Sequence, residues 1–435
     1  MKIGIIGLGF VGLSFASVLA SNGHKVIGVD SDNIKINQIL SGTAPFYEKD
    51  LDKTLQKGLK NGLIVTDDIN SIATCELIFV TVGTPQQKNG SIDLDTIKAV
   101  SKKIGKILAK TNNSPIIIIK STVVPGTTTN VVLPILEKQS RKKVGKSFGL
   151  VTNPEFLRET NAIQDTIHPH VVVIGSFNDR FTKKIEKFYI EFHLDVPIVK
   201  TNHQTAEMIK YANNSFLATK ISFINQIARI CEAVPGANVD DVARTIGLDP
   251  RIGGLFLNAG PGYGGSCLPK DVKAIMDFSR KCRVDSPLLN AVELINNKQL
   301  LRTISIIKKN LGVISKKTVT VLGLAFKPDT DDIRDSVSIK MIELLLKNRV
   351  KVVVHDPKAI QNTKKIFGSK IKYTESINDA LNGSHCAIIM TAWNDYMKLT
   401  NKDFRFMKNK LVIDSRRILA KKNLKLNYYA IGIGR

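Results

Sequence analysis

Short apolar runs alternate with longer amphipathic stretches over roughly the first 200 residues of this chain. The runs are rich in Val and Ile, which favour β-strands, and the stretches between them repeat apolar residues at helical spacing. Such an alternation is typical of a parallel sheet covered by helices. The expected strands are Ile3–Ile6, Val26–Val29, Leu77–Val82, Ile116–Ile119 and Val171–Ile174.

Two long helical patterns, His203–Ala233 and Pro287–Leu311, interrupt this alternation, which then resumes after Gly312. We therefore predict an α/β fold in which two Rossmann-like doubly wound domains are joined by a helical central domain. The expected boundaries are 1–202, 203–312 and 313–435. The later strands are expected at Thr318–Leu322, Val350–Val354, Cys386–Met390 and Leu411–Asp414.

The composition supports a globular protein of more than one domain. A chain of 435 residues is too long for one ordinary core, and 43% hydrophobic with 23% charged residues is a globular balance. No run is long and apolar enough to span a membrane, and the start of the chain lacks the pattern of a signal peptide. Five scattered cysteines without a CxxC pair argue against a disulfide framework or a metal site and favour the reducing cytoplasm.

A formal net charge of +25 raises the question of a nucleic-acid or membrane partner. The lysines are spread along the whole chain, and few aromatic residues interleave them as in a stacking platform. We interpret the charge as a solvated lysine-rich surface that attracts anionic substrates, and we expect neither nucleic acid nor a membrane as partner.

A glycine motif directly follows the first expected strand. Gly7, Gly9 and Gly12 form the GxGxxG spacing that allows a tight turn, a close approach of pyrophosphate and helix packing. Asp30 ends the second expected strand, where a carboxylate binds a ribose diol and repels a 2′-phosphate, so NAD is favoured over NADP. Lys35 could help to tolerate either cofactor. The residues expected to bind the cofactor here are Gly7, Leu8, Gly9, Phe10, Val11, Gly12, Asp30 and Lys35.

Further polar residues follow apolar runs at the carboxyl ends of strands, where ligands of open α/β sheets bind. Thr84 and Pro85 follow one such run, and Thr122 follows another. A capping residue in an ordinary turn is the structural alternative at each place.

Cys267 lies in a glycine-rich loop directly before an expected helix start. Glycines let the backbone approach a ligand, while Pro269 and Asp271 suit the first turn of a helix whose dipole favours a thiolate. We interpret this thiol as a nucleophile, in preference to an inert buried cysteine.

Two other segments place ionisable groups four residues apart. Glu155 and Glu159 would share a face if Phe156–Ala162 were helical, and Lys210 and Asn214 lie one turn apart on an expected helix. Together with the cysteine and the dinucleotide motif, they suggest a reaction centre, although each alone also fits a solvated helix face.

The chain resembles the nucleotide-sugar 6-dehydrogenases, the family of UDP-glucose dehydrogenase and its GDP-mannose and UDP-N-acetylhexosamine relatives. The resemblance covers nearly the whole length. It is carried by the segments GLGFVG, VGTP, STVVPGTT, NPEFLRE, EMIKYANNSF, GYGGSCLPKD and GLAFKPDTDDIRDS.

The resemblance implies a four-electron oxidation of a sugar C6 alcohol to a carboxylate with reduction of two NAD. It implies that Lys210 and Asp271 hold a water that acts as base, that Asn214 with Lys210 stabilises negative charge, and that Cys267 forms a thiohemiacetal and then a thioester. Glu155 resembles the base for thioester hydrolysis, with Thr122 nearby. Family members usually supply uronic acids for polysaccharide biosynthesis.

The resemblance also implies binding residues and a homodimer. Glu159 and Arg334 resemble cofactor contacts, and Arg251 resembles a residue that reaches the substrate of a neighbouring subunit. Which of Arg416 and Arg417 points inward stays open. The implied substrate contacts are Glu155, Phe156, Leu157, Lys210, Asn214, Arg251, Asn258, Gly262, Tyr263, Gly264, Phe326, Lys327 and Arg416.

The identity of the sugar nucleotide stays open. Asn258 and Tyr263 differ from residues frequent in UDP-glucose enzymes, whereas Ser266 before Cys267 favours UDP-glucose over the N-acetylhexosamine or GDP-mannose alternatives. Two remoter alternatives are a two-electron hydroxyacid dehydrogenase and a basic protein that binds nucleic acid without catalysis.

Overall fold

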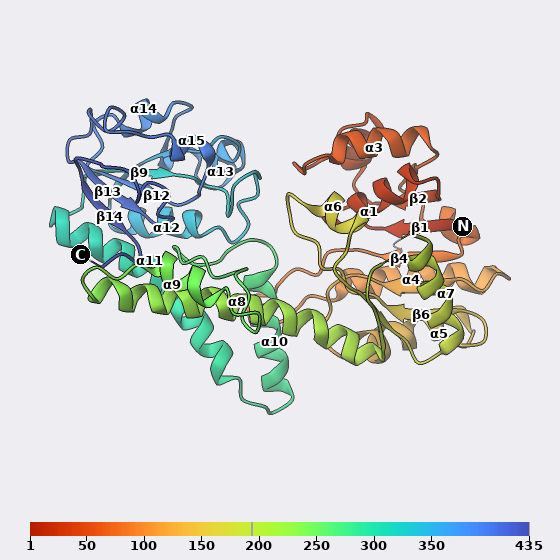
Figure 1. The fold of residues 1–435 in the computed structure, drawn as a ribbon. Helices are drawn as coiled ribbons and strands as arrows, with labels where there is room; N and C mark the ends of the chain where they lie inside the picture. Colours follow the sequence, from red (N-terminus) through yellow and green to blue (C-terminus); the bar gives the residue numbers. More distant parts are fainter. Residues whose placement is uncertain (193–194, 435) are drawn as a thin grey trace. The chain divides into compact units, whose positions relative to one another are not determined.

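The computed structural model describes residues 1–192 and 195–434. The chain divides into two compact units, Met1–Asn213 and Asn214–Arg435. Each unit is built around its own β-sheet (Figure 1). Within the described ranges, no helix has the length and apolar character that crossing a membrane requires.

The first unit contains an eight-stranded sheet in the order β3-β2-β1-β4-β5-β6-β7-β8. All neighbours are parallel except β6 and β7, which meet through the single antiparallel pair Thr152 and Gly175. The strands are β1 (Lys2–Ile6), β2 (Lys25–Val29), β3 (Ile64–Thr66), β4 (Leu77–Val80), β5 (Ile116–Ile119), β6 (Gly149–Thr152), β7 (Val172–Gly175) and β8 (Ile198–Thr201).

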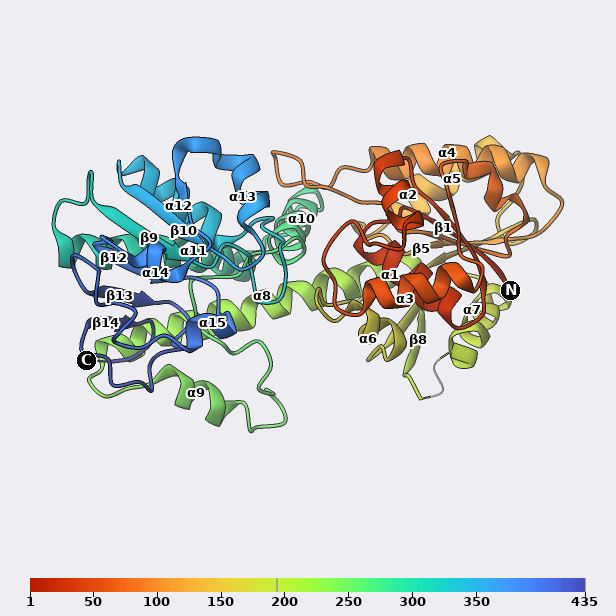
Figure 2. The same cartoon turned by 90° about the horizontal axis from the view of Figure 1, so that it is seen from above.

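Helices cover both faces of this sheet, as the alternation of apolar residues predicts. Ile3 and Ile5 of β1 belong to a core that includes α1 and α3, whereas Ile6 faces a second core with α4 and α5. Figure 2 shows α4 and α5 on one side and α3 on the other. The helices are α1 (Phe10–Ser21), α2 (Asn33–Leu40), α3 (Leu51–Lys60), α4 (Asp95–Lys110), α5 (Leu133–Ser140), α6 (Ala162–Ile167) and α7 (Asp179–Phe192), with short helices at Ile69–Thr74 and Thr128–Val132.

The second unit contains a six-stranded, wholly parallel sheet in the order β11-β10-β9-β12-β13-β14. Its strands are β9 (Thr318–Leu322), β10 (Lys351–His355), β11 (Lys372–Tyr373), β12 (Cys386–Ile389), β13 (Leu411–Asp414) and β14 (Asn427–Ala430). The later helices are α8 (His203–Ala233), α9 (Val239–Ile246), α10 (Leu268–Lys281), α11 (Pro287–Leu311), α12 (Val337–Lys347), α13 (Ile360–Phe367), α14 (Ile377–Leu381) and α15 (Asn394–Met397), with a short helix at Gly368–Lys370.

The predicted α/β fold with two doubly wound sheets and long helices between them is confirmed. The bounds of α8, α11 and β9 agree with the sequence pattern, and β4 ends two residues before the expected Val82. It ends there because the Thr81 hydroxyl donates to the carbonyls of Ile6 and Gly7 and turns the chain away. β7 and β10 each begin one residue later than expected.

Both sheets use the same turn after their first central strand. Gly7 has φ of 97° and Gly323 has φ of 95°, and in each case the next residue donates its N–H over 2.7 Å to an aspartate, Asp30 or Asp356. Only a residue that tolerates positive φ fits this position. The carboxylate of Asp356 is fully occupied by protein donors. It also accepts hydrogen bonds from three further backbone N–H groups and from the indole of Trp393.

Replacement of Asp356 by Ala is expected to destabilise the second unit by about 3–5 kcal/mol, because several buried donors lose their acceptor at once. Urea unfolding followed by circular dichroism measures the loss. The exposed Glu375→Ala serves as control, with a change within about 0.5 kcal/mol. An equally small change for Asp356→Ala would contradict this account of the turn.

Candidate active site

The turn between β1 and α1 leaves room for a phosphate group. A Cβ atom built on Gly12 would lie 1.9 Å from the Gly7 carbonyl oxygen, so helix and strand can approach only with glycine there. A Cβ atom on Gly9 would meet nothing within 4 Å, so the space in front of the α1 N-terminus is open. Backbone N–H groups at such a helix start bind anions, and the predicted pyrophosphate fits this turn.

Asp30 provides the carboxylate that a ribose diol requires. One of its oxygens accepts the Leu8 N–H at 2.7 Å and the Lys35 ammonium at 2.8 Å, and the other accepts the Asp32 N–H. Burial raises the pKa of Asp30, but the hydrogen bonds from Lys35, Leu8 and Asp32 outweigh it, so the pKa is lowered and the group is anionic at neutral pH. The residues therefore fit NAD, whose ribose carries no phosphate at the 2′ position.

The turns after β4 and β5 are joined to each other. The Thr84 hydroxyl donates to the Thr122 carbonyl at 2.8 Å, and the Ser121 hydroxyl donates to the Val82 carbonyl at 2.7 Å. Thr122, Thr84 and Pro85 thus lie at one edge of the sheet, as the strand pattern predicts. The loop that follows is held by Glu207 of α8, which accepts the N–H groups of Gly126 and Thr128.

Glu155 lies in the loop after β6 and forms a buried ion pair. Its Oε1 atom lies 3.1 Å from Nζ of Lys210, and both side chains are less than 10% exposed. Its other oxygen accepts the Leu157 N–H, and the Lys210 ammonium lies 5.2 Å from the centre of the Phe156 ring. These bonds fix the Glu155 carboxylate in one orientation.

Residues 156–161 are not helical, so the condition under which Glu155 and Glu159 would share a helix face is not met. The helix starts only at Ala162, because Glu48 accepts the N–H groups of Thr160 and Ala162 and holds Thr160 at a φ of 67°. The four-residue spacing of the two glutamates therefore does not place their carboxylates on one helix face.

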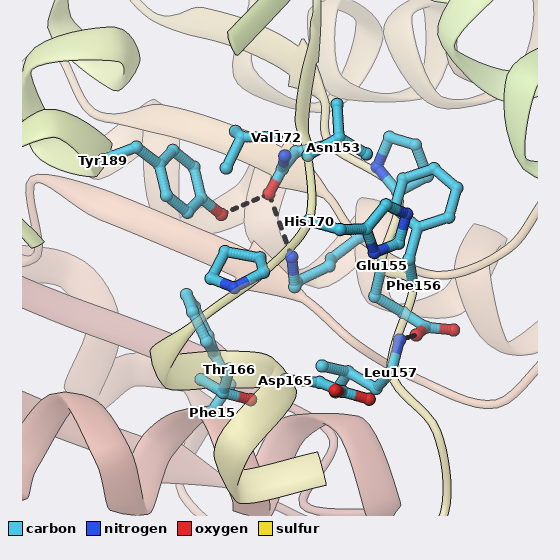
Figure 3. A pocket seen from close by; sticks show the side chains of 14 residues that line it. Phe15, Asn153, Glu155, Phe156, Leu157, Asp165, Thr166, His170, Val172 and Tyr189 are labelled. Carbon is cyan, nitrogen blue, oxygen red and sulfur yellow. Dashed lines mark hydrogen bonds between the residues drawn. The ribbon is translucent and has the colours of Figure 1, made fainter. Parts of the chain in front are cut away.

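A small cavity lies behind the Glu155 loop (Figure 3). Its polar lining includes Lys120, Asn153, Thr166 and Tyr189, and the Thr166 hydroxyl is buried without a hydrogen-bond partner among the described residues. The sequence pattern placed the segment that begins at Lys120 at the carboxyl end of a strand but assigned no role to Lys120 or Asn153. The signal was present in Lys120, a charged residue directly after four consecutive isoleucines.

Cys267 occupies the N-cap position of α10, and its thiol is exposed. Pro269 and Asp271 lie in the first turn of this helix, as expected. The positive end of a helix dipole favours a thiolate over a thiol. The thiol is exposed at a helix start, so the alternative of a buried cysteine is wrong for this residue.

Polar residues of two long helices hold the cysteine loop. Asn225 of α8 accepts the Gly260 N–H at 2.7 Å, and Gln299 of α11 donates to the Gly260 carbonyl at 2.8 Å. Asn296 of α11 bonds both backbone groups of Tyr263, whose hydroxyl donates to Glu293. A Cβ atom at Gly262 would meet the Asn296 oxygen at 2.6 Å, which explains the glycine.

Asp271 is fully buried beside the cysteine and is paired on both oxygens. It accepts the Asn214 amide at 2.6 Å and the Lys270 ammonium at 2.6 Å. Asn214 lies on α8 one turn after Lys210. The predicted residues thus form two clusters, with Glu155 and Lys210 in the first unit and Cys267, Asp271 and Asn214 in the second.

The segment after β9 packs against the cysteine loop. The Phe326 ring would lie 2.8 Å from a Cβ atom at Gly265, and the Gly265 N–H donates to the Arg334 carbonyl. The Arg334 guanidinium pairs with Asp332 at 2.6 Å, and the Lys327 ammonium lies over the Phe326 ring. Phe326 and Lys327 are therefore brought to the loop that carries Cys267.

The doubled arginine after β13 has two different roles. Arg417 pairs with Asp240 of α9 at 2.8 Å, whereas a guanidinium nitrogen of Arg416 lies 2.9 Å from the Cβ position of Gly260. Burial lowers the pKa of Arg416 to about 10, so it remains cationic at neutral pH. Arg416 is thus the arginine at the cysteine loop. Asn258 and Arg251 are exposed, and Arg251 pairs with Asp249.

The chain matches three family models. Residues 1–193 match the NAD binding domain of the UDP-glucose/GDP-mannose dehydrogenase family, residues 204–298 its central domain and residues 320–421 its UDP binding domain.

Individual relatives match over almost the whole chain. The UDP-glucose 6-dehydrogenase AglM of Haloferax volcanii is 39% identical over 97% of this chain and 98% of its own, and TuaD of Bacillus subtilis, also a UDP-glucose 6-dehydrogenase, is 39% identical over 99% and 93%. A solved structure of a UDP-glucose dehydrogenase from Pyrobaculum islandicum superposes with a TM-score of 0.93 at 32% identity, covering 99% of this chain and 98% of that one. On this agreement of models, relatives and fold, the chain belongs to the UDP-glucose/GDP-mannose dehydrogenase family.

Proposed function

We propose that this protein oxidises UDP-glucose at C6 to UDP-glucuronate with NAD as cofactor. The observation that carries the proposal is the exposed thiol of Cys267 at the start of α10, next to the buried pair of Asp271 and Asn214. A two-electron alcohol oxidation has no use for such a nucleophile, whereas oxidation beyond the aldehyde does.

We assign three tasks to residues of this chain: removal of the alcohol proton, addition of a thiol to the aldehyde, and activation of a water. As the alcohol becomes an aldehyde, its hydroxyl proton passes to a water, which we assign to Lys210 and Asp271, while Asn214 stabilises charge on the oxygen. Sγ of Cys267 then adds to the aldehyde carbon, and oxidation of the resulting thiohemiacetal leaves a thioester. Bound NAD⁺ supplies the chemistry of hydride acceptance, once for each oxidation.

Hydrolysis completes the cycle. We assign the activation of water to Glu155, which removes a proton as the water oxygen attacks the thioester carbon, and the thiolate of Cys267 leaves. In sum, one alcohol, two NAD⁺ and one water give one carboxylate, two NADH and three protons. Thr122 is proposed to hydrogen-bond near this water.

Binding of the sugar nucleotide is assigned to the cysteine loop and its neighbours. Tyr263 is held by Asn296 and Glu293, and Arg416 and Lys327 offer cations for a diphosphate. Phe156, Leu157, Arg251, Asn258, Gly262, Gly264 and Phe326 are proposed as further substrate contacts, and Glu159 and Arg334 as further cofactor contacts. UDP-glucose is preferred because relatives at 39% identity act on it by name. A UDP-N-acetylhexosamine or GDP-mannose is the alternative.

We further propose a homodimer formed through the central helices of the predicted domain 203–312, which lies between the proposed 1–202 and 313–435 domains. Phe216, Phe223 and Ile230 of α8 are each at least 50% exposed and recur every seven residues, so they form one apolar stripe. Leu294 and Leu301 of α11 repeat the same spacing and exposure. A second copy of the chain is the partner that such a repeated stripe fits best. An exposed thiol also suits a reducing compartment, and we infer the cytoplasm.

The function is tested with purified protein, NAD⁺ and a panel of UDP-glucose, UDP-N-acetylglucosamine, UDP-N-acetylmannosamine and GDP-mannose. Two NADH per UDP-glucose and a uronic acid product are expected. Cys267→Ser should lower kcat by about 10³-fold or more, while Cys282→Ser, the exposed cysteine after the same helix, should retain activity. One NADH per substrate, or full activity of Cys267→Ser, would point to a hydroxyacid dehydrogenase or a binding protein instead.

Gly9→Ala is expected to weaken NADH binding about tenfold or more while leaving the melting temperature unchanged, because the added methyl fills open phosphate space and meets no protein atom. Fluorescence titration and thermal melting measure the two effects. Gly254→Ala adds a methyl with no protein atom closer than 4.0 Å in the second unit and should change neither. If Gly9→Ala bound NADH as tightly as the wild type, the pyrophosphate would not bind at this turn.

Phe223→Glu is expected to convert the dimer to a monomer at micromolar concentration, because a carboxylate would be buried in an apolar interface. Light scattering after size-exclusion chromatography gives the mass. The matched control is Phe406→Glu, which replaces another exposed phenylalanine. A dimer that survives Phe223→Glu would place the interface elsewhere.

A further inference from the structure

Lys120 is a buried lysine that the proposed reaction does not use. It follows β5 directly, is 7% exposed and donates from Nζ to Oδ1 of Asn153 at 3.0 Å. Its ammonium also lies 5.0 Å from the centre of the Phe15 ring. Lysine is almost never buried in this way without a partner, so the contact with Asn153 is a specific one.

Asn153 is held on every side. Its Oδ1 atom also accepts the Tyr189 hydroxyl at 2.5 Å, its amide donates to the Val173 carbonyl at 2.8 Å, and its backbone N–H bonds the Ile119 carbonyl. The dashed lines in Figure 3 mark the two bonds to its oxygen. Elements β5, β7 and α7 therefore determine where this one side chain lies.

The position of Asn153 constrains the position of Glu155. Only Pro154 separates the two, and proline fixes its own φ and restricts the residue before it to extended backbone. The loop is therefore stiff, and a shift of Asn153 moves the Glu155 carboxylate. Its ion pair with Lys210 at 3.1 Å leaves little freedom for compensation.

Charge connects the same groups. Burial lowers the pKa of Lys120 to about 8, Glu155 raises it and Lys210 lowers it. At neutral pH the ammonium is therefore mostly protonated, and a second cation accompanies the Glu155–Lys210 pair. Asp165, His170 and Tyr189 line the same cavity, and the Asp165 carboxylate is paired with Arg158 at 2.6 Å.

We propose that Lys120 is a positioning residue for Glu155, which holds the Asn153–Pro154–Glu155 turn in place and adds a cation beside the catalytic carboxylate. This inference rests on the proposed function, in which Glu155 activates the water that hydrolyses the thioester. Lys120 then acts on hydrolysis and not on the preceding oxidation steps.

The test is Lys120→Met, which keeps an unbranched side chain one atom shorter but removes the hydrogen bond and the charge. Hydrolysis should slow about 10–100-fold, as expected for a misplaced catalytic group, while KM for UDP-glucose and NAD⁺ changes less than about threefold. Rapid mixing should show a burst of two NADH per subunit before a slow steady state. Mass spectrometry of quenched enzyme should find an acyl adduct on Cys267.

Thermal melting separates this role from a merely structural one. The folded-state pKa of Lys120 lies below its unfolded value, so the charged form is disfavoured in the folded protein, and wild-type stability from this group rises between about pH 8 and pH 10.5. Lys120→Met should therefore melt no lower than wild type at pH 7. Above pH 8 the melting temperature of the wild type should rise relative to that of Lys120→Met.

Three further single variants and one double variant complete the design. Asn153→Ala should reproduce the burst, and its combination with Lys120→Met should be no worse than the poorer single variant, because both act through one turn. Tyr189→Phe removes the other donor to the same oxygen but keeps the cation, and it should slow hydrolysis less than threefold. Glu155→Gln tests the proposed function itself.

The outcomes are distinguishable. A Glu155→Gln enzyme that hydrolyses its thioester at the wild-type rate overturns the role of Glu155. If Glu155→Gln is slow but Lys120→Met shows no burst and no adduct, the positioning role of Lys120 is wrong. It is equally wrong if Lys120→Met slows every step alike and melts at lower temperature.

Discussion

Helix α8 buries polar residues as well as apolar ones, and the loops that carry the candidate site residues bond to these buried polar groups. At about 100° per residue, its buried polar residues fall on one side of the helix and its exposed Phe216, Phe223 and Ile230 on the opposite side. Burial of a polar group is costly unless it is hydrogen-bonded, and most of these residues bond a loop, a strand or a neighbouring helix. The buried polar residues of α8 are His203, Glu207, Lys210, Asn214, Ser215, Ser222 and Asn225.

These bonds attach loops of each unit to residues of α8 that belong to the same unit. Glu207 fixes the loop after Thr122, and Lys210 fixes Glu155. Asn214 bonds Asp271, and Asn225 bonds the glycine loop before Cys267. Lys120, at the end of β5, bonds the same turn at Asn153, whereas Lys210 bonds it at Glu155.

The two sheets show how one turn serves two purposes. Asp30 and Asp356 occupy equivalent places after the second strand of each sheet, and both accept the N–H that follows a glycine of positive φ. Asp356 is saturated by protein donors, including the Trp393 indole, and is 2% exposed. Asp30 has fewer donors, and its side chain is 9% exposed. The first sheet can therefore present a carboxylate to a ribose, while the second uses it to stabilise its own turn.

The sequence alone determined the two doubly wound sheets, the bounds of α8 and α11, the dinucleotide turn and the place of Cys267 at a helix start. These features depend on local periodicity, glycine spacing and helix-start residues, which act over a few positions and are visible in the chain. The tertiary structure alone decided that 156–161 is a loop, because Glu48, more than 100 residues away, supplies the acceptors that hold it. It likewise decided that Arg416 rather than Arg417 reaches the cysteine loop and that Lys120 bonds Asn153, since such pairings between distant segments arise from packing and leave no periodic trace.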